Sequence, residues 1–159
     1  MAIILPNKPA CVVIDANIMV ALCAKEPLRF VALTAEVESY ARAGSLFYAP
    51  NIIVGESLYA LRRKLTDGAL NATEHAQAVQ SLRVRMTAIL PPSGGEASLI
   101  LRADQICDGY GYSRSADALY IALAEELSQT HTTHLLTFDQ GLPKQAAQNA
   151  PLVNVHLLT

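Results

Sequence analysis

Short apolar runs rich in β-branched residues alternate along the chain with longer segments in which apolar residues recur at helical spacing. The first run, residues 11–14, ends at a polar residue, and apolar residues three and four positions apart follow it, which predicts a strand that leads into a helix. The same pattern predicts five strands, at residues 11–14, 46–49, 86–90, 134–137 and 152–155. Strands that alternate with helices favour right-handed crossovers and a central parallel sheet with helices on both faces.

Glycine, proline and polar residues separate the helical segments. Ser93 and Glu96 have the spacing of a capping box, which predicts that a helix begins there. The expected helices cover residues 16–25, 28–42, 51–65, 73–85, a segment that ends at about 108, a segment that begins at 113 or 115, and 140–147.

Four acidic residues lie among apolar neighbours: Asp15, Glu56, Asp117 and Asp139. Burying an isolated carboxylate is costly or forces its protonation, and several carboxylates repel one another unless a cation neutralises them. Asp15 and Asp139 directly follow predicted strands, and ligands bind beyond the carboxyl ends of the strands in an open parallel sheet. If these two strands are neighbours, we expect Asp117, in the first turn of a helix, and Glu56, on a crossing helix, to reach the same crevice.

A set of oxygen ligands without His or Cys suits Mg²⁺ or Mn²⁺. One or two such ions can lower the pKa of a bound water, orient it and neutralise charge on a leaving oxygen, which is the chemistry of phosphodiester hydrolysis. Asn17 and Thr137 each lie two residues from an acid, and we expect them to orient a carboxylate or a metal-bound water. The sequence therefore predicts a hydrolase that depends on a divalent metal.

Three of the four acids also have a structural explanation. Asp117 and Asp139 lie near the starts of predicted helices, where a carboxylate complements the helix dipole. Glu56 alone fits the exposed side of an amphipathic helix. Asp15 is harder to explain in this way, because it follows an apolar strand and has no cation near it in sequence. The functional hypothesis therefore depends on the four acids taken together.

The composition predicts one domain over residues 1–159, since a domain usually has about 100–200 residues. Apolar residues make up 52% of the chain and charged residues 16%, which excludes a disordered chain and fits strands buried on both faces. No apolar run approaches the roughly 20 residues of a membrane span, and the first residues do not form an export signal. The three cysteines are far apart and have apolar neighbours, which fits reduced thiols, so we expect a soluble cytoplasmic protein.

The net charge of −2 gives no general attraction to nucleic acid, so any RNA contact must come from a local patch. The candidates for contacts with RNA phosphates flank the acids in sequence and are Arg62, Arg63, Lys64 and Arg114. The four histidines form no HExxH pair, and the chain has no Gly-x-Ser-x-Gly elbow and no nucleotide-binding glycine loop. Metal-assisted hydrolysis is therefore the chemistry that the sequence favours.

With these residues the chain resembles the PIN-domain family, and within it the small VapC-type toxin ribonucleases. The resemblance covers nearly the whole chain and rests on four motifs in order: an apolar strand that ends in Asp-x-Asn, here VVIDAN; a helix after a proline with an inward Glu, here APNIIVGESLYALRRKL; the segment DALYIALA; and a strand that ends in L-x-T-x-D, here LLTFD. By similarity, the metal-binding acids are Asp15, Glu56, Asp117 and Asp139, and the residues that support them are Asn17 and Thr137.

The resemblance implies a single PIN-like α/β domain with a five-stranded parallel sheet of order 3-2-1-4-5. It also implies an endoribonuclease that uses Mg²⁺ or Mn²⁺, hydrolyses RNA phosphodiester bonds and is the toxin of a toxin–antitoxin pair. The expected partners are RNA, a second copy in a homodimer, and an antitoxin protein whose C-terminal segment blocks the site.

Two alternatives stay open. A PIN scaffold that binds RNA or protein without cleaving RNA has the same fold, although the presence of all four acids argues against a lost site. A haloacid-dehalogenase-like phosphatase also has a first strand that ends in Asp. That family requires a second Asp two residues later, where this chain has Asn17, and a positioned Lys for which the chain has no candidate.

Overall fold

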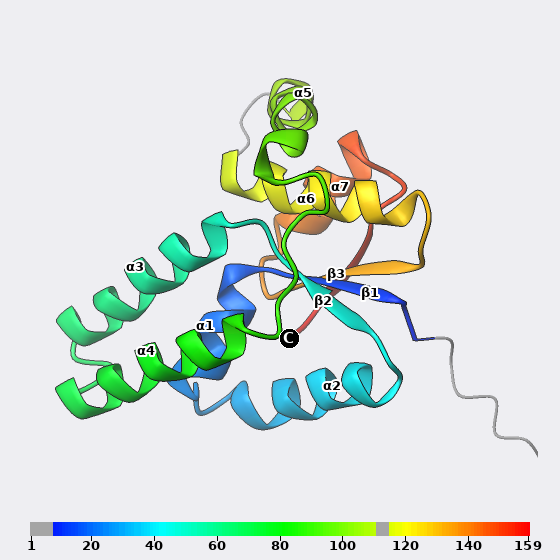
Figure 1. Ribbon diagram of the computed structural model, residues 1–159. Coiled ribbons are helices and arrows are strands. Elements are labelled where there is room, and N and C mark those ends of the chain that lie inside the picture. The colour runs from blue at the N-terminus through cyan, green and yellow to red at the C-terminus, as the bar shows by residue number, and fades with distance from the viewer. Residues whose placement is uncertain (1–7, 111–114) are drawn as a thin grey trace, which may run out of the picture.

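Strands and helices alternate in the computed structural model, which describes residues 8–110 and 115–159 (Figure 1). The elements in chain order are β1 (Cys11–Ile14), α1 (Ala16–Ala24), α2 (Phe30–Arg42), β2 (Leu46–Tyr48), α3 (Ile52–Thr66), α4 (Ala72–Met86), the 3-10 helix η1 (Glu96–Leu99), α5 (Ile100–Tyr110), α6 (Ser115–Ser128), β3 (Thr133–Thr137), α7 (Leu142–Asn149) and β4 (Asn154–Leu157). None of the helices in this part of the chain is long and apolar enough to cross a membrane.

Four parallel strands form the sheet in the order β2-β1-β3-β4. The predicted order of these four strands is therefore confirmed. β1 and β3 are the central pair, and Ile14 lies opposite Leu136 near their carboxyl ends. Because the two strands are parallel neighbours, Asp15 and Asp139 follow them at the same edge of the sheet.

The predicted strand at residues 86–90 is reduced to a single bridge, so the sheet has four strands where about five were expected. α4 continues to Met86, and the N–H groups of residues 87–89 bond back to the last carbonyl groups of that helix. Leu90 then pairs with Tyr48 through one parallel bridge. Two prolines follow Leu90, and because proline has no N–H group the pairing cannot continue there.

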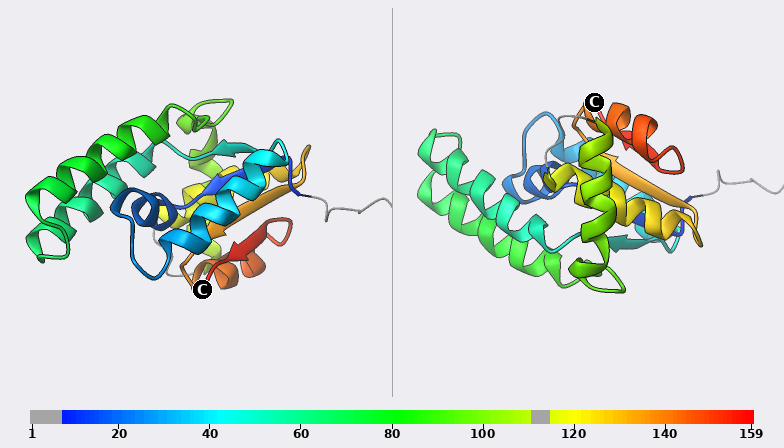
Figure 2. Two further views of the ribbon diagram at one scale, coloured as in Figure 1. Left: turned by 90° about the horizontal axis from the view of Figure 1, so that it is seen from below. Right: turned by 90° about the horizontal axis from the view of Figure 1, so that it is seen from above.

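The two faces of the sheet pack against different helices. Val12, Ile14 and Leu136 share one core with α2 and one side of α1. Val13 and Leu135 share the other core with α3 to α7 and the second side of α1. Figure 2 shows α2 over the sheet from below and α5 and α6 over it from above, which confirms the prediction of helices on both faces.

α3 and α4 lie side by side, pack on α1 and extend away from the sheet (Figure 1). A capping box begins α4: Asn71 Oδ1 accepts a hydrogen bond from the Glu74 N–H at 2.8 Å, and Glu74 Oε2 accepts one from the Asn71 N–H at 2.8 Å. The capping box predicted from Ser93 and Glu96 is wrong, because no side chain caps η1. Glu96 Oε2 instead accepts a hydrogen bond from the N–H of Asn51, at the start of α3, at 2.9 Å.

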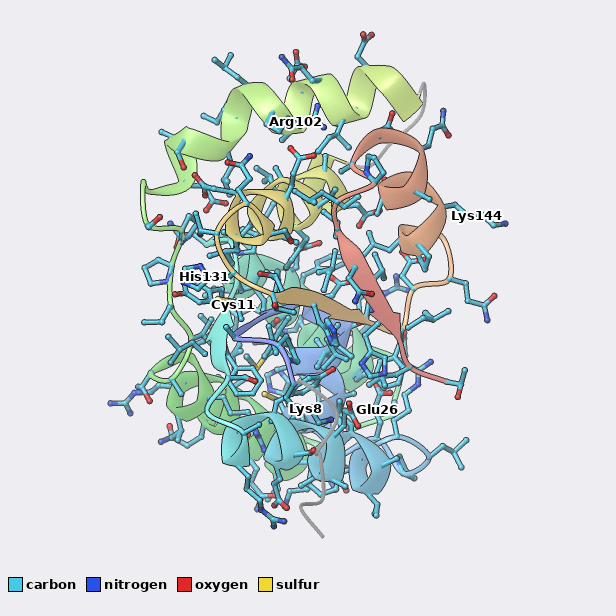
Figure 3. The ribbon with its side chains drawn as sticks, turned by 90° about the vertical axis from the view of Figure 1, so that its right-hand side faces the viewer. Lys8, Cys11, Glu26, Arg102, His131 and Lys144 are labelled. Atoms are coloured by element: carbon cyan, nitrogen blue, oxygen red, sulfur yellow. The ribbon has the colours of Figure 1, made fainter. Side chains whose placement is uncertain are left out.

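Arg102 on α5 joins that helix to its neighbours (Figure 3). Its Nε and Nη2 donate to the two carboxylate oxygens of Glu125 on α6, at 2.6 and 2.8 Å. Nη2 also donates to the carbonyl oxygen of Asn149, at the end of α7, at 2.7 Å. Such bidentate pairs are strong and geometrically specific, so Arg102 fixes α5 against both α6 and α7.

Candidate functional site

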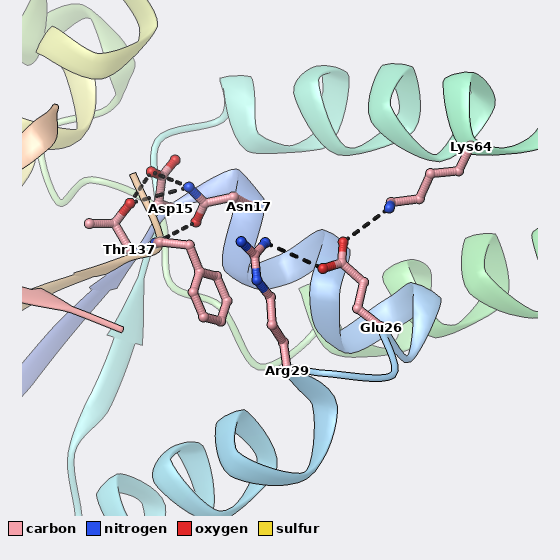
Figure 4. A network of polar contacts seen from close by, with 7 residues as sticks. Asp15, Asn17, Glu26, Arg29, Lys64 and Thr137 are labelled. Atoms are coloured by element: carbon pink, nitrogen blue, oxygen red, sulfur yellow. Dashed lines mark hydrogen bonds and ion pairs between the residues drawn. The ribbon is translucent and has the colours of Figure 1, made fainter. Parts of the chain in front are cut away.

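Asp15 is the first residue after β1, and the residue is only 7% exposed. Oδ1 accepts a hydrogen bond from the Ala16 N–H at 2.7 Å, so the carboxylate also caps α1. Oδ2 accepts hydrogen bonds from Thr137 Oγ1 at 2.7 Å and from Asn17 Nδ2 at 3.2 Å (Figure 4). The structure therefore brings together the acid and the two polar residues that the sequence placed beside it.

Thr137, the last residue of β3, links Asp15 to the loop that carries Asp139. Its fully buried hydroxyl donates to Asp15 and accepts hydrogen bonds from the Asp139 N–H at 2.9 Å and from Asn17 Nδ2 at 3.2 Å. Asn17 Oδ1 accepts from the Phe138 N–H at 3.2 Å (Figure 4). The Asp139 carboxylate stabilises the turn in its own loop, since Oδ1 accepts a hydrogen bond from the Gly141 N–H at 2.7 Å. These bonds fix the carboxyl ends of the two central strands to each other.

Glu56 and Asp117 each bond to a buried side chain that the sequence analysis did not identify. Glu56 lies on α3 and is partly buried, and its Oε1 accepts a hydrogen bond from the Tyr120 hydroxyl at 2.8 Å. Asp117 lies in the first turn of α6, as predicted, and its Oδ2 accepts from Gln145 Nε2 on α7 at 3.2 Å. Tyr120 stands inside the DALYIALA motif, which was the available signal for it, whereas Gln145 has none in its local sequence.

The charges of three acids act on one another. Burial raises the pKa of Asp15 to about 6; the hydrogen bonds from Thr137 and Ala16 oppose this rise, and the charges of Asp117 and Glu56 add to it. Burial also raises the pKa of Glu56, against the hydrogen bond from Tyr120 and with the charge of Asp117. Three of the four predicted acids therefore share one electrostatic environment. Asp139 is linked to Asp15 through its backbone only, since its N–H bonds to the Thr137 hydroxyl that donates to Asp15.

The four acids do not lie close enough together in the structure to coordinate one metal ion. In residues 8–110 and 115–159, no three His, Cys, Asp or Glu side chains stand close enough to hold an ion as they are placed. Electrostatic repulsion acts over longer distances than metal coordination, so the charges of Asp117 and Glu56 add to the rise that burial causes in the pKa of Asp15, although these acids are not close enough together to share an ion. No Lys or Arg in this part of the chain forms an ion pair with Asp15 or Glu56. Carboxylates that are buried or partly buried and repel one another fit a hard divalent cation, which would relieve the repulsion.

The predicted cationic residues differ in their surroundings. Lys64 Nζ forms an ion pair with Glu26 Oε1 at 3.1 Å, and Arg63 lies 3.9 Å from Asp67. Glu26 also accepts a hydrogen bond from Arg29, whose guanidinium lies 4.2 Å from the ring centre of Phe138 (Figure 4). Lys64 is thereby connected to the loop after β3. The last two candidates are Arg62, which is exposed on α3, and Arg114, which lies outside the described residues.

The sequence matches the PIN domain family over residues 12–148, a segment that contains all four acids. The chain belongs to the PIN-domain family, whose members are generally nucleases that use divalent metals. The matched segment includes β1 from Val12 onward, β2 and β3, together with the acids that follow β1 and β3. A comparison with curated proteins finds no match to the chain.

Solved structures of low sequence identity share the fold. VapBC2 from Rickettsia felis, bound to a DNA fragment from its promoter, is 14% identical, with 94% of this chain and 99% of that chain covered and a TM-score of 0.65. FitAB bound to the IR36 DNA fragment is 18% identical, with 93% and 98% covered and a TM-score of 0.59. FitAcB from Neisseria gonorrhoeae is 20% identical, with 91% and 95% covered and a TM-score of 0.56. At these identities the likeness shows the fold.

Proposed function

We propose that the protein is a divalent-metal-dependent endoribonuclease that hydrolyses RNA phosphodiester bonds and is the toxin of a toxin–antitoxin pair. The observation that carries the proposal is the burial of Asp15 at the carboxyl end of β1. Thr137 bonds to it there, and the charges of Asp117 and Glu56 disfavour its ionised form. Membership of the PIN-domain family supports nuclease chemistry at this position.

The proposed ligands of the ion are the carboxylates at this edge of the sheet: Asp15, Glu56, Asp117 and Asp139. When bound there, Mg²⁺ or Mn²⁺ supplies an activated water and neutralises charge on the phosphodiester. Asn17 and Thr137 hold Asp15 in one orientation, and Gln145 holds Asp117. Carboxylates fixed in advance need little rearrangement when a charged ligand arrives.

RNA phosphates outside the cleaved bond would contact the cations near the site. Arg62, Arg63 and Lys64 lie on the last turns of α3, the helix that carries Glu56. Phosphate contacts position a nucleic acid without reading its sequence, so these residues would add affinity rather than choose the target. Arg114 belongs to the same proposed group by its position in the sequence, close to Asp117.

We also propose an antitoxin partner and a homodimer. Two of the similar structures, VapBC2 and FitAB, are complexes bound to DNA, and this supports an antitoxin partner for the chain. The surface available for a homodimer includes large exposed apolar side chains on α3: Ile52, Val54, Leu58 and Tyr59. Val54 and Leu58 lie one turn apart on this helix, and exposed apolar patches often mark protein interfaces.

The binding of Mn²⁺ to the purified protein tests the metal site. At a Mn²⁺ concentration about 100 times its Kd, binding contributes about 2.7 kcal/mol and raises Tm by about 5–10 °C. We expect this rise in the wild type and not in Asp15→Ala, measured by thermal unfolding in Mn²⁺ and in EDTA. Asp104→Ala, at an exposed position on α5, is the matched control and is expected to keep the full rise.

The outcome separates the proposal from its alternatives. A wild type that shows no Mn²⁺ effect contradicts the metal site and favours a PIN scaffold that binds without cleaving. The match to the PIN-domain family leaves the haloacid-dehalogenase-like phosphatase without support. Asn17, which stands where that family needs a second Asp, bonds to Asp15 and Thr137 as an amide.

A further inference from the structure

Tyr120 is a buried side chain that bonds directly to one of the four acids. It lies on α6 one turn after Asp117, it is 1% exposed, and its hydroxyl donates to Glu56 Oε1 at 2.8 Å. Among the residues that the structure describes, Tyr120 is the one hydrogen-bond donor to the Glu56 carboxylate. The bond therefore ties the helix that carries Asp117 to the side chain of a second acid.

Helix packing alone does not fix the place of the Glu56 carboxylate. α3 packs chiefly on α1 and α4, whereas α6 packs on α5 and on the two central strands. Glu has three rotatable side-chain bonds, and Glu56 is only partly buried, so conformers that point to water compete with the one that faces Asp117. The hydrogen bond to Tyr120 spans 64 residues of sequence and selects the conformer that faces the other acids.

Glu56 and Asp117 are both acidic, so their carboxylates repel each other when both are ionised. In the bond that joins Tyr120 to Glu56, the phenol hydroxyl donates and the carboxylate oxygen accepts. Hydrogen bonds to ionised groups are stronger than those between neutral groups.

We propose that Tyr120 is a positioning residue that holds Glu56 among the acids and thereby increases the affinity of the site for a divalent cation. This inference rests on the proposed metal site and adds to it a residue that would not touch the ion. It assigns a role to a position of the DALYIALA motif that the proposed chemistry leaves without one.

The variant Tyr120→Phe tests the inference, because it removes one oxygen atom and keeps the ring. With Mn²⁺ alone as the probe, titrated through the electron paramagnetic resonance signal of the free ion, we expect the Kd to rise about tenfold. Tyr40→Phe is the matched control. Tyr40 is also fully buried, but its hydroxyl bonds to His134 and His156 on the α2 face of the sheet, so its loss should leave the Kd within about twofold.

A double-variant cycle separates positioning from a general loss of structure. In the Glu56→Gln background, Tyr120→Phe is expected to change the Mn²⁺ Kd no further, because the tyrosine acts through that carboxylate. Should Tyr120→Phe fail to fold, Tyr120→Met replaces it, because methionine also fills the buried position without an O–H donor. The same rise in the Mn²⁺ Kd is expected.

Two results would overturn the inference and leave the proposed function intact: an unchanged Mn²⁺ Kd in Tyr120→Phe, or equal losses in Tyr120→Phe and Tyr40→Phe while the wild type binds the ion. A wild type that neither binds Mn²⁺ nor cleaves RNA would overturn the proposed function, and the inference with it.

Discussion

At the scale of single residues, ionisation of the buried Asp15 side chain lowers the stability of the fold. Burial raises its pKa from 3.8 to about 6. Because the folded-state pKa lies above the unfolded value, the cost of ionisation is absent below pH 3.8, grows between pH 3.8 and about 6 and is fully present above that. The free energy of unfolding therefore carries a penalty at neutral pH that a bound cation would remove.

Asp15→Asn should relieve this penalty, since Asn is as good an N-cap as Asp. The rise in the pKa of Asp15 from 3.8 to about 6 corresponds to at most about 3 kcal/mol, so we expect this substitution to raise the free energy of unfolding by about 1–3 kcal/mol at pH 8 and by less than about 1 kcal/mol at pH 4. Urea denaturation in EDTA at the two pH values measures the difference. The change at exposed Asp104, Asp104→Asn, is the control and should have little effect at either pH.

The difference between variant and wild type isolates Asp15 from the other titrating groups. Burial, His156 and Lys8 lower the pKa of His134, so the stability that this residue contributes is lost as pH falls below 6.5, in both proteins alike. A destabilisation of similar size at pH 4 and pH 8 would contradict the account, because it would mean that Asp15 acts through packing and not through its charge.

Some residues of the site could be predicted from sequence and others could not. Asp15 directly follows an apolar strand, and Asn17 and Thr137 lie two residues from acids, so each has a local signal, and the structure places these three together. Tyr120 and Gln145 bond to acids on other elements. An apolar helical pattern accounts for a buried Tyr without any partner, and no local rule pairs a Gln with a distant Asp.

At the scale of secondary-structure elements, α4 begins with a capping box whose contribution can be measured. Asn71 Oδ1 accepts the Glu74 N–H, which would otherwise have no partner in the helix. Asn71→Ala is therefore expected to lower the free energy of unfolding by about 1 kcal/mol, as judged from the midpoint of urea denaturation. Asn51→Ala is the control: Asn51 has the same position at the start of α3 but makes no side-chain cap. Equal effects of the two variants would refute the capping argument.

The expected strand at residues 86–90 is an example of an element boundary that a sequence pattern does not determine. Met86, Ile89 and Leu90 are apolar and fit a short strand as well as the last turn of a helix. The hydrogen bonds of residues 87–89 to the end of α4 and the prolines after Leu90 decide the outcome. Glu96 likewise matches a capping box by spacing, yet it bonds to Asn51, which is 45 residues away.

At the scale of the whole molecule, the strand order brings the proposed site residues toward one edge of the sheet. With β1 and β3 as neighbours, Asp15 and Asp139 emerge at one edge of the sheet, and α6 and α3 bring Asp117 and Glu56 toward it. Alternating strands and helices were enough to predict a parallel sheet, whereas its order came from the family resemblance. The single domain over residues 1–159 and the site residues themselves stay predictions.

Cleavage of end-labelled total RNA and purified tRNA in Mg²⁺, Mn²⁺ or EDTA, with Asp15→Asn beside the wild type, tests the central claim most directly. Asp15 lies at the proposed metal site, and its replacement by Asn keeps the cap of α1. The account predicts discrete cuts that need the metal and fall at least about a hundredfold in Asp15→Asn. Cleavage that persists in EDTA, or that Asp15→Asn performs at the wild-type rate, would contradict it.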